Sequence, residues 1–175
     1  EPMIHKDIVE IVSMTKNSGI DVSFTTNGTV IKEAFVKQSL QHISWMKVSM
    51  NAGKASTYAK VHQTDERDFN KVVENMQKVT RFKRDQGLSF SVGVQSLLLP
   101  ENIDEMEELV RLCRDEMEVD YLVVKPYSQH RFSETRLYEK VDYSSSFELG
   151  KQLEELSTKD FNVIFRAHTI RKHME

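Results

Sequence analysis

The sequence predicts an α/β fold with a parallel sheet, of the barrel or the doubly wound kind. Segments with helical periodicity alternate along the whole chain with segments that have strand periodicity. A helical pattern separates each pair of consecutive expected strands, and parallel strands need such crossover connections. The segment 119–125 (VDYLVVK) is also apolar enough to be buried on both faces, as strands of parallel sheets are.

The individual elements follow from this alternation. Strands are expected at residues 20–26, 43–50, 88–96, 119–125 and 161–166. Helices are expected at residues 7–18, 30–41, 54–61, 66–85, 103–117 and 145–157. In helix 66–85 apolar residues fall at helical spacing, and Gly87 stands where a terminating glycine belongs, as Gly19 does after the first helix. No linker interrupts this order, so we expect one domain over residues 1–175.

Two of the expected helices are preceded by residues that are typical of a helix N-terminus. Asn102 precedes helix 103–117 with Glu105 three residues later, which predicts a variant of the capping box with asparagine as the N-cap. Helix 145–157 is expected to start at Ser145, with Glu148 three residues further on.

Composition and charge exclude several classes of protein. The chain is 39% hydrophobic and 29% charged, and its net charge of −3 gives no reason to expect nucleic acid or an anionic membrane as a partner. No run approaches the ~20 apolar residues of a membrane span, and the first residues lack the layout of a signal peptide. With one cysteine in 175 residues, an internal disulfide framework is excluded and a cytoplasmic location is expected.

Polar side chains recur at the carboxyl ends of the expected strands. In both parallel architectures ligands bind at that edge of the sheet. Small hydroxyl and amide groups there suit a polyhydroxylated ligand held by neutral hydrogen bonds. The residues concerned are Thr26, Asn27, Ser49, Asn51, Gly93, Gln95, Lys125, Tyr127 and Gln129.

Each of these signals also has a structural interpretation. Asn27-Gly28 is a common turn pair after any strand. Ser49 and Asn51 can serve loop hydrogen bonds, and a glycine inside a strand, such as Gly93, indicates either a bulge or a close approach of backbone or ligand. Lys125 ends a buried strand, so its ammonium group must reach a cavity or a partner.

No catalytic group accompanies this binding edge. The histidines, carboxylates and the cysteine lack metal-ligand spacing, so no metal site is expected in the chain. Cys113 lies inside an expected helix, where it serves as a small buried hydrophobic residue. The glycine-rich phosphate loops GxGxxG and GxxxxGK are absent, and the strand ends carry no pair of carboxylates for acid–base catalysis.

The strand ends resemble those of the radical S-adenosylmethionine (radical SAM) superfamily. The resemblance implies a partial TIM-like (β/α) barrel, in which this chain supplies about strands 3–6 with the helices outside. The motifs that carry it are Glu1-Pro2 before a helix, a strand ending in Thr25-Thr26-Asn27-Gly28, a strand ending in Ser49-Met50-Asn51, and the segments 93–96 and 123–127 in the same order as in the family.

The resemblance implies S-adenosylmethionine as the cofactor. Glu1 and Pro2 match the end of the family's Gly-Gly-Glu-Pro segment, which binds the methionyl amino group. Ser49 and Asn51 match a Ser-x-Asp/Asn pattern that contacts the ribose. The cofactor-binding residues that it implies are Glu1, Pro2, Thr26, Asn27, Ser49, Asn51, Gly93 and Gln95.

The resemblance also implies an oxidoreductase activity for an intact parent protein. In the family a [4Fe–4S] cluster cleaves S-adenosylmethionine reductively, and the 5′-deoxyadenosyl radical abstracts a hydrogen atom from the substrate. Lys125, Tyr127 and Gln129 are the expected substrate contacts. The substrate class stays open and includes peptides or proteins, because residues 158–175 resemble the approach to a Cys-rich (SPASM-type) extension with auxiliary clusters.

One departure from the family is large. The family's cluster is held by three thiolates of a CxxxCxxC loop, and thiolates are the ligands that such a cluster needs. This sequence has no such loop. We therefore expect the chain to be a core barrel fragment that is inactive alone, and to self-associate through an open barrel edge.

Two alternatives stay open at this point. A conventional barrel lyase or aldolase would use Lys125 as a Schiff-base nucleophile. A non-catalytic α/β binding module would bind a partner protein and have no affinity for S-adenosylmethionine.

Overall fold

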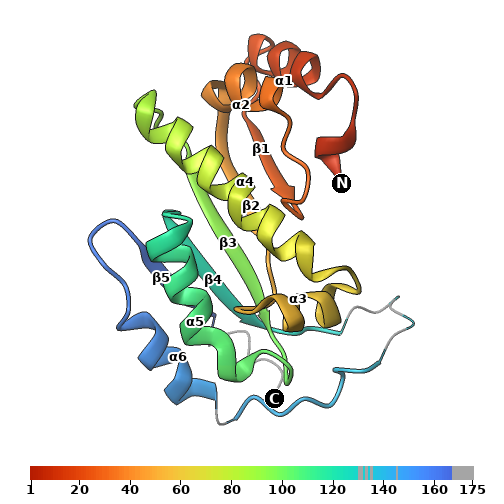
Figure 1. Cartoon of the computed structure of the whole chain (residues 1–175), viewed down its shortest axis with the longest axis vertical. Coiled ribbons are helices and arrows are strands. Elements are labelled where there is room, and N and C mark those ends of the chain that lie inside the picture. The colour runs from red at the N-terminus through yellow and green to blue at the C-terminus, as the bar shows by residue number, and fades with distance from the viewer. Residues whose placement is uncertain (130–131, 133, 135, 145, 167–175) are drawn as a thin grey trace.

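Five parallel strands form one sheet in the order β1-β2-β3-β4-β5 (Figure 1). The structure is a computed structural model of the chain, and it describes residues 1–129, 132, 134, 136–144 and 146–166. The strands are β1 (Val22–Thr26), β2 (Ile43–Ser49), β3 (Ser91–Leu98), β4 (Tyr121–Pro126) and β5 (Asn162–Phe165). Every neighbouring pair is parallel, which confirms the expected α/β fold.

The strand order distinguishes between the two parallel architectures. A doubly wound sheet reverses its strand order at a switch point, whereas a (β/α) barrel adds strands in chain order. In the described part of the chain the order is sequential throughout. The sheet is therefore an arc of a barrel, as the resemblance implied.

Helices connect the strands and cover one face of the sheet. Figure 1 shows α4 and α5 crossing in front of the strands. The α-helices are α1 (Ile8–Asn17), α2 (Glu33–Ser39), α3 (Ala55–His62), α4 (Glu66–Asp85), α5 (Met106–Arg111) and α6 (Ser146–Glu154). Shorter helical turns are η1 (Pro2–Ile4), η2 (Leu40–His42), η3 (Ile103–Glu105) and the π-helical η4 (Leu112–Glu116).

Helix ends confirm two of the sequence signals. α4 has the bounds that its periodicity predicts, residues 66–85. Gly19 and Gly87 follow their helices with φ angles of +77° and +60°, a conformation that favours glycine. The expected start of the last helix at Ser145 lies outside the described residues.

The predicted capping box at helix 103–117 is wrong. The Asn102 side chain does not cap the helix. Its Oδ1 accepts from the Leu99 N–H (2.8 Å), and its Nδ2 donates to the carbonyls of Asn51 (2.9 Å) and Leu97 (2.8 Å). The Glu105 carboxylate accepts hydrogen bonds from the segment that precedes and begins α3. Buried backbone groups without partners are costly, so satisfying them outweighs a local cap.

The third strand lies further along the chain than residues 88–96. The Leu88 N–H donates to the Lys83 carbonyl (2.9 Å), so Leu88 belongs to the turn that follows α4 and not to the strand. At the other end, Leu97 and Leu98 pair with Lys125 and Pro126 of β4, which extends the strand.

The two faces of the sheet differ in burial. Side chains that point toward the helices form the core, and in β3 these are Val92, Val94, Ser96 and Leu98, all 0% exposed. Because side chains alternate along a strand, the other residues point to the opposite side, which we call the open face. The open face comprises Ser23, Thr25, Trp45, Lys47, Ser49, Ser91, Gly93, Gln95, Leu97, Tyr121, Val123, Lys125, Asn162 and Ile164, followed by Arg166 after β5.

Candidate functional site

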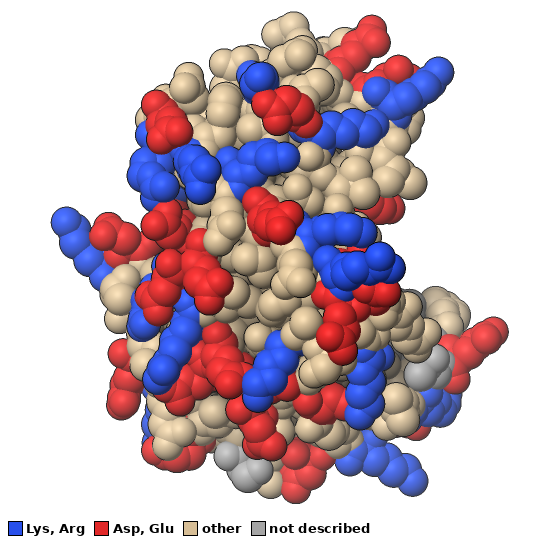
Figure 2. Space-filling model, viewed as in Figure 1, with Lys and Arg blue, Asp and Glu red and all other residues tan. Residues whose placement is uncertain are grey.

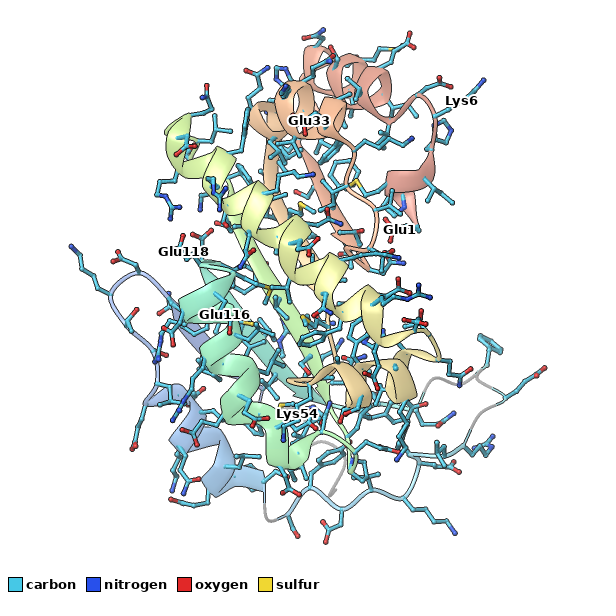
Figure 3. All side chains as sticks on the ribbon, in the orientation of Figure 1. Glu1, Lys6, Glu33, Lys54, Glu116 and Glu118 are labelled. Atoms are coloured by element: carbon cyan, nitrogen blue, oxygen red, sulfur yellow. The ribbon has the colours of Figure 1, made fainter. Side chains whose placement is uncertain are left out.

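The carboxylate of Glu1 joins the N-terminal turn to the carboxyl end of β1 (Figure 3). Its Oε1 accepts hydrogen bonds from the Met3 N–H (3.0 Å) and the Thr26 hydroxyl (2.6 Å). Its Oε2 accepts one from the Asn27 N–H (2.8 Å). A carboxylate offers about four acceptor positions. One position on Oε2 is therefore available to another donor.

Asn27 and Gly28 form a tight turn, as their dipeptide predicts. Asn27 Oδ1 accepts from the backbone N–H (3.1 Å) and the hydroxyl (2.9 Å) of Thr29. Gly28 has a φ of +74°, and a Cβ at this position would lie 3.0 Å from a methyl carbon of Val48. The Gly28 N–H also donates to the Thr26 hydroxyl (3.1 Å). This turn fixes the groups that hold Glu1.

The end of β2 presents one free hydroxyl and a partly used amide. The Ser49 hydroxyl has no hydrogen-bond partner among the described residues. Asn51 Oδ1 accepts from the Leu97 N–H (2.8 Å), and its carbonyl accepts from Asn102. The Asn51 N–H donates to Nε2 of His62 (3.1 Å). Asn51 therefore ties β2 to β3, and its Nδ2 is left without a partner in the described part of the chain.

β3 carries a glycine whose missing side chain makes room for an aromatic ring. A Cβ on Gly93 would lie 2.4 Å from the Tyr121 ring, because the two residues are neighbours in register on the open face. Gln95 Oε1 accepts from the Lys47 ammonium group at 3.2 Å. Gly93 thus has a packing role, and a role in binding the adenine stays a prediction.

The segment after β4 forms a small cavity at the same end of the sheet. The Tyr127 N–H donates to the Tyr143 hydroxyl (3.0 Å), which donates to the Leu98 carbonyl (2.8 Å). The Tyr127 hydroxyl donates to Gln129 Oε1 (3.0 Å), and both residues line a cavity of about 330 Å³. Lys125 instead lies on the open face of β4.

The expected site residues thus fall into three groups. Glu1, Thr26 and Asn27 are joined by hydrogen bonds at β1, Ser49 and Asn51 end β2, and Tyr127 and Gln129 share the cavity after β4. Pro2 begins the turn η1 that carries Glu1. Gln95 and Lys125 belong to the open face.

Sequence reasoning missed a second cluster, on the open face. Lys47 and Arg166 line a cavity there together with Trp45 and Tyr121. The signal available in the sequence was the alternation in the strand 43–49, where Trp45, Lys47 and Ser49 are two residues apart.

The residues at the ends of β1 and β2 fit parts of S-adenosylmethionine. Glu1 offers an acceptor to an ammonium group, and Ser49 and Asn51 offer a hydroxyl and an amide N–H to a ribose.

The residues of this chain do not fit the iron–sulfur cluster. Such a cluster needs several thiolates, and Cys113 is the one cysteine of the chain. Cys113 is completely buried in η4, and this burial raises the pKa of its thiol far above the usual range. No group of three or more His, Cys, Asp or Glu side chains in the described residues could hold a metal ion.

The fold and the site define a class of protein: an arc of a parallel (β/α) barrel with polar groups at the carboxyl edge of its strands. The sequence model of the radical SAM superfamily matches residues 1–113. The chain therefore belongs to the radical SAM superfamily, whose members use S-adenosylmethionine and a [4Fe–4S] cluster.

Curated relatives are similar over part of the chain. A protein named "Probable GTP 3′,8-cyclase" from Saccharolobus islandicus (strain Y.N.15.51) is 36% identical over 77 residues, which is 43% of this chain and 24% of that protein. A protein of the same name from Methanocaldococcus jannaschii is 28% identical over 116 residues, 66% of this chain and 37% of that protein.

Solved structures share the fold over nearly the whole chain. SuiB from Streptococcus suis, solved with its precursor peptide SuiA, superposes with a TM-score of 0.75 at 15% identity and covers 99% of this chain and 39% of SuiB. TYW1 with a bound lysine-pyruvate adduct has a TM-score of 0.65 at 15% identity and covers 89% of this chain and 47% of that protein. The chain thus spans less than half the length of each of these proteins.

Across the described residues, none of the helices combines the length and the apolar character that crossing a membrane requires.

Proposed function

We propose that this chain is the S-adenosylmethionine-binding part of a radical SAM enzyme that, when whole, removes a hydrogen atom from its substrate. Membership of the superfamily supports this proposal over the aldolase and the non-catalytic binding module. When bound, S-adenosylmethionine supplies the 5′-deoxyadenosyl group for such hydrogen-atom abstraction. The protein's share of the work is binding and orientation. A cytoplasmic location remains part of the proposal.

The Glu1 carboxylate is the observation that carries this proposal. Thr26 and Asn27 hold it at the carboxyl edge of β1 through hydrogen bonds of 2.6 Å and 2.8 Å. A carboxylate fixed in this way needs no reorganisation when it accepts a hydrogen bond from the methionyl ammonium group. Ser49 and the Asn51 amide would contact the ribose.

The substrate would lie beside the cofactor, at the ends of β3 and β4. Lys125, Tyr127 and Gln129 are the proposed substrate contacts on β4 and its connection. The similar proteins differ in what their names state, since some are named as GTP cyclases and SuiB was solved with a precursor peptide. The names of these proteins therefore do not identify a substrate class for this chain, which must be inferred from its own side chains.

Isothermal titration of the 175-residue chain with S-adenosylmethionine tests the proposal. We expect saturable binding that Glu1→Gln weakens about 10-fold, because hydrogen bonds to charged groups contribute about 1.5–3 kcal/mol. Ser49→Ala should weaken binding by a smaller factor, about 2- to 5-fold.

Two matched variants serve as controls for these substitutions. Glu10→Gln changes an exposed carboxylate on α1, and Ser56→Ala changes an exposed hydroxyl on α3. Both should bind S-adenosylmethionine like the unchanged chain. Absence of saturable binding, or an equal loss in Glu10→Gln, would contradict the proposal.

A further inference from the structure

Three cationic side chains of the open face have no carboxylate partner in the described part of the chain. They are Lys47 on β2, Lys125 on β4 and Arg166 after β5. Figure 2 shows the contrasting helix-covered face, where basic and acidic side chains are intermixed. On that face Lys54, for example, forms an ion pair of 3.0 Å with Glu108 (Figure 3). The open face therefore concentrates positive charge.

Two of these cations, Lys47 and Arg166, line a cavity together with aromatic side chains. The cavity has a volume of about 400 Å³ and is lined by Lys47, Arg166, Trp45, Gln95 and Tyr121 together with smaller side chains. Ligand sites for small molecules have volumes of about 300–1,000 Å³. None of the described residues that line the cavity carries a carboxylate. The cavity is thus lined by both cationic and aromatic side chains.

Lys47 is held in place within this cavity. Its ammonium group donates to Gln95 Oε1 at 3.2 Å and lies 5.7 Å from the centre of the Trp45 ring. Burial lowers the pKa of Lys47, and the neighbouring charges of Lys125 and Arg166 lower it further. Like charges in this proximity raise the free energy of the folded chain, and a bound anion would relieve that cost.

We propose that the open face binds an organic phosphate ester, with its phosphate near Lys47, Lys125 and Arg166 and its apolar body against Trp45. Three cations suit a dianionic group better than a monoanionic one, and a guanidinium matches the geometry of phosphate oxygens. That this ligand is the substrate rests on the proposed function, since Lys125 is a proposed substrate contact of the same barrel.

Trp45 provides the test, because it is the single tryptophan of the chain and is 40% exposed in the cavity. Its fluorescence should change saturably with phenyl phosphate. Inorganic phosphate should bind more weakly, because it lacks an apolar body, and benzoate should bind at least about 10-fold more weakly than phenyl phosphate, because it carries a single charge. Sodium chloride at equal ionic strength should give no saturable change.

Substitutions then separate the site from general charge effects. Lys47→Met and Arg166→Met should each weaken phenyl phosphate about 10-fold in isothermal titration, with unchanged far-ultraviolet circular dichroism. Lys60→Met, an exposed lysine on α3, should leave the affinity unchanged. No saturable binding, equal loss in Lys60→Met, or benzoate as tight as phenyl phosphate would each overturn the proposal.

Titration with S-adenosylmethionine distinguishes this inference from the proposed function. Arg166→Met should bind S-adenosylmethionine like the unchanged chain while its phenyl phosphate affinity falls. If phenyl phosphate binds and S-adenosylmethionine does not, the anion site stands and its role as the substrate site of a radical enzyme is overturned. If S-adenosylmethionine binds and phenyl phosphate does not, the anion site is overturned and the proposed function stands.

Discussion

At the residue scale, His62 positions the proposed ribose-binding loop after β2. Its Nε2 accepts the Asn51 N–H at 3.1 Å, and its ring stacks on Tyr58 with 4.2 Å between the centroids. Burial lowers the pKa of His62 below its usual value of 6.5. The imidazole is therefore neutral at neutral pH, which is the form that can accept this hydrogen bond.

This environment predicts a pH dependence of stability. Because the pKa of His62 is lower in the folded than in the unfolded chain, the unfolded chain binds more protons at acidic pH. The contribution of the neutral His62 imidazole to the free energy of unfolding is complete above about pH 6.5. It is lost as the pH falls from there through the pKa of His62 in the folded chain. Urea unfolding at several pH values between about 8 and 5 would measure it.

A pair of histidine variants separates His62 from the other titrating groups. His62→Gln keeps a side-chain acceptor that does not titrate, so its free energy of unfolding should vary less with pH over this range. His42→Gln, which changes a histidine before β2, should keep the full dependence. An identical pH dependence in His62→Gln would exclude His62 as its source.

At the scale of elements, one hydroxyl links the ends of two strands and the connection between β4 and α6. In Figure 1 the described residues 136–144 of this connection run along the lower end of the sheet. The buried Tyr143 hydroxyl accepts from the Tyr127 N–H (3.0 Å) and donates to the Leu98 carbonyl (2.8 Å). These bonds hold the proposed substrate contacts Tyr127 and Gln129 next to β3.

Removing this hydroxyl should destabilise the chain. In Tyr143→Phe two backbone groups lose their partner, and an unsatisfied buried group costs about 1–3 kcal/mol. Tyr121→Phe is the matched control, because the Tyr121 hydroxyl has no hydrogen-bond partner in the described part of the chain. Urea unfolding should give a clearly lower free energy for Tyr143→Phe than for Tyr121→Phe. Equal values would show that the link carries no stability.

At the scale of the whole molecule, hydrophobic periodicity was sufficient to predict the parallel α/β fold. Burial on one face imposes this periodicity, so α4 was predicted with its observed bounds. The cap at Asn102 was wrong because its partners Leu97 and Asn51 come from other elements. Local patterns do not contain such tertiary contacts.

The candidate site could be predicted only where a general rule or the family resemblance applied, and Glu1 came from the resemblance alone. Polar residues at strand ends, such as Thr26 and Asn51, follow from where parallel sheets bind ligands. The contact between Gly93 and Tyr121 depends on the register of β3 and β4, which the sequence does not reveal. The cavity at Lys47 and Arg166 depends on which face the helices leave open.

The two edges of the sheet, together with apolar side chains on the open face, give the molecule surfaces for self-association. β1 and β5 each pair with one neighbour in the described residues, so each leaves a strand edge unpaired. Trp45 and Ile164 are 40% and 44% exposed on the open face. Unpaired edges beside exposed apolar side chains favour pairing with another chain.

We therefore expect the apparent mass of the chain in sedimentation velocity to rise with concentration. Ile164→Lys places a charge on the edge strand β5, and charged side chains oppose edge pairing, so this variant should remain monomeric at higher concentrations. Met14→Lys introduces the same charge at an exposed apolar site on the helix α1, outside both edge strands, and should associate like the unchanged chain. A monomer at every concentration for the unchanged chain would show that its edges are already protected. Equal suppression by both variants would assign the effect to net charge, because only Ile164→Lys alters an edge strand.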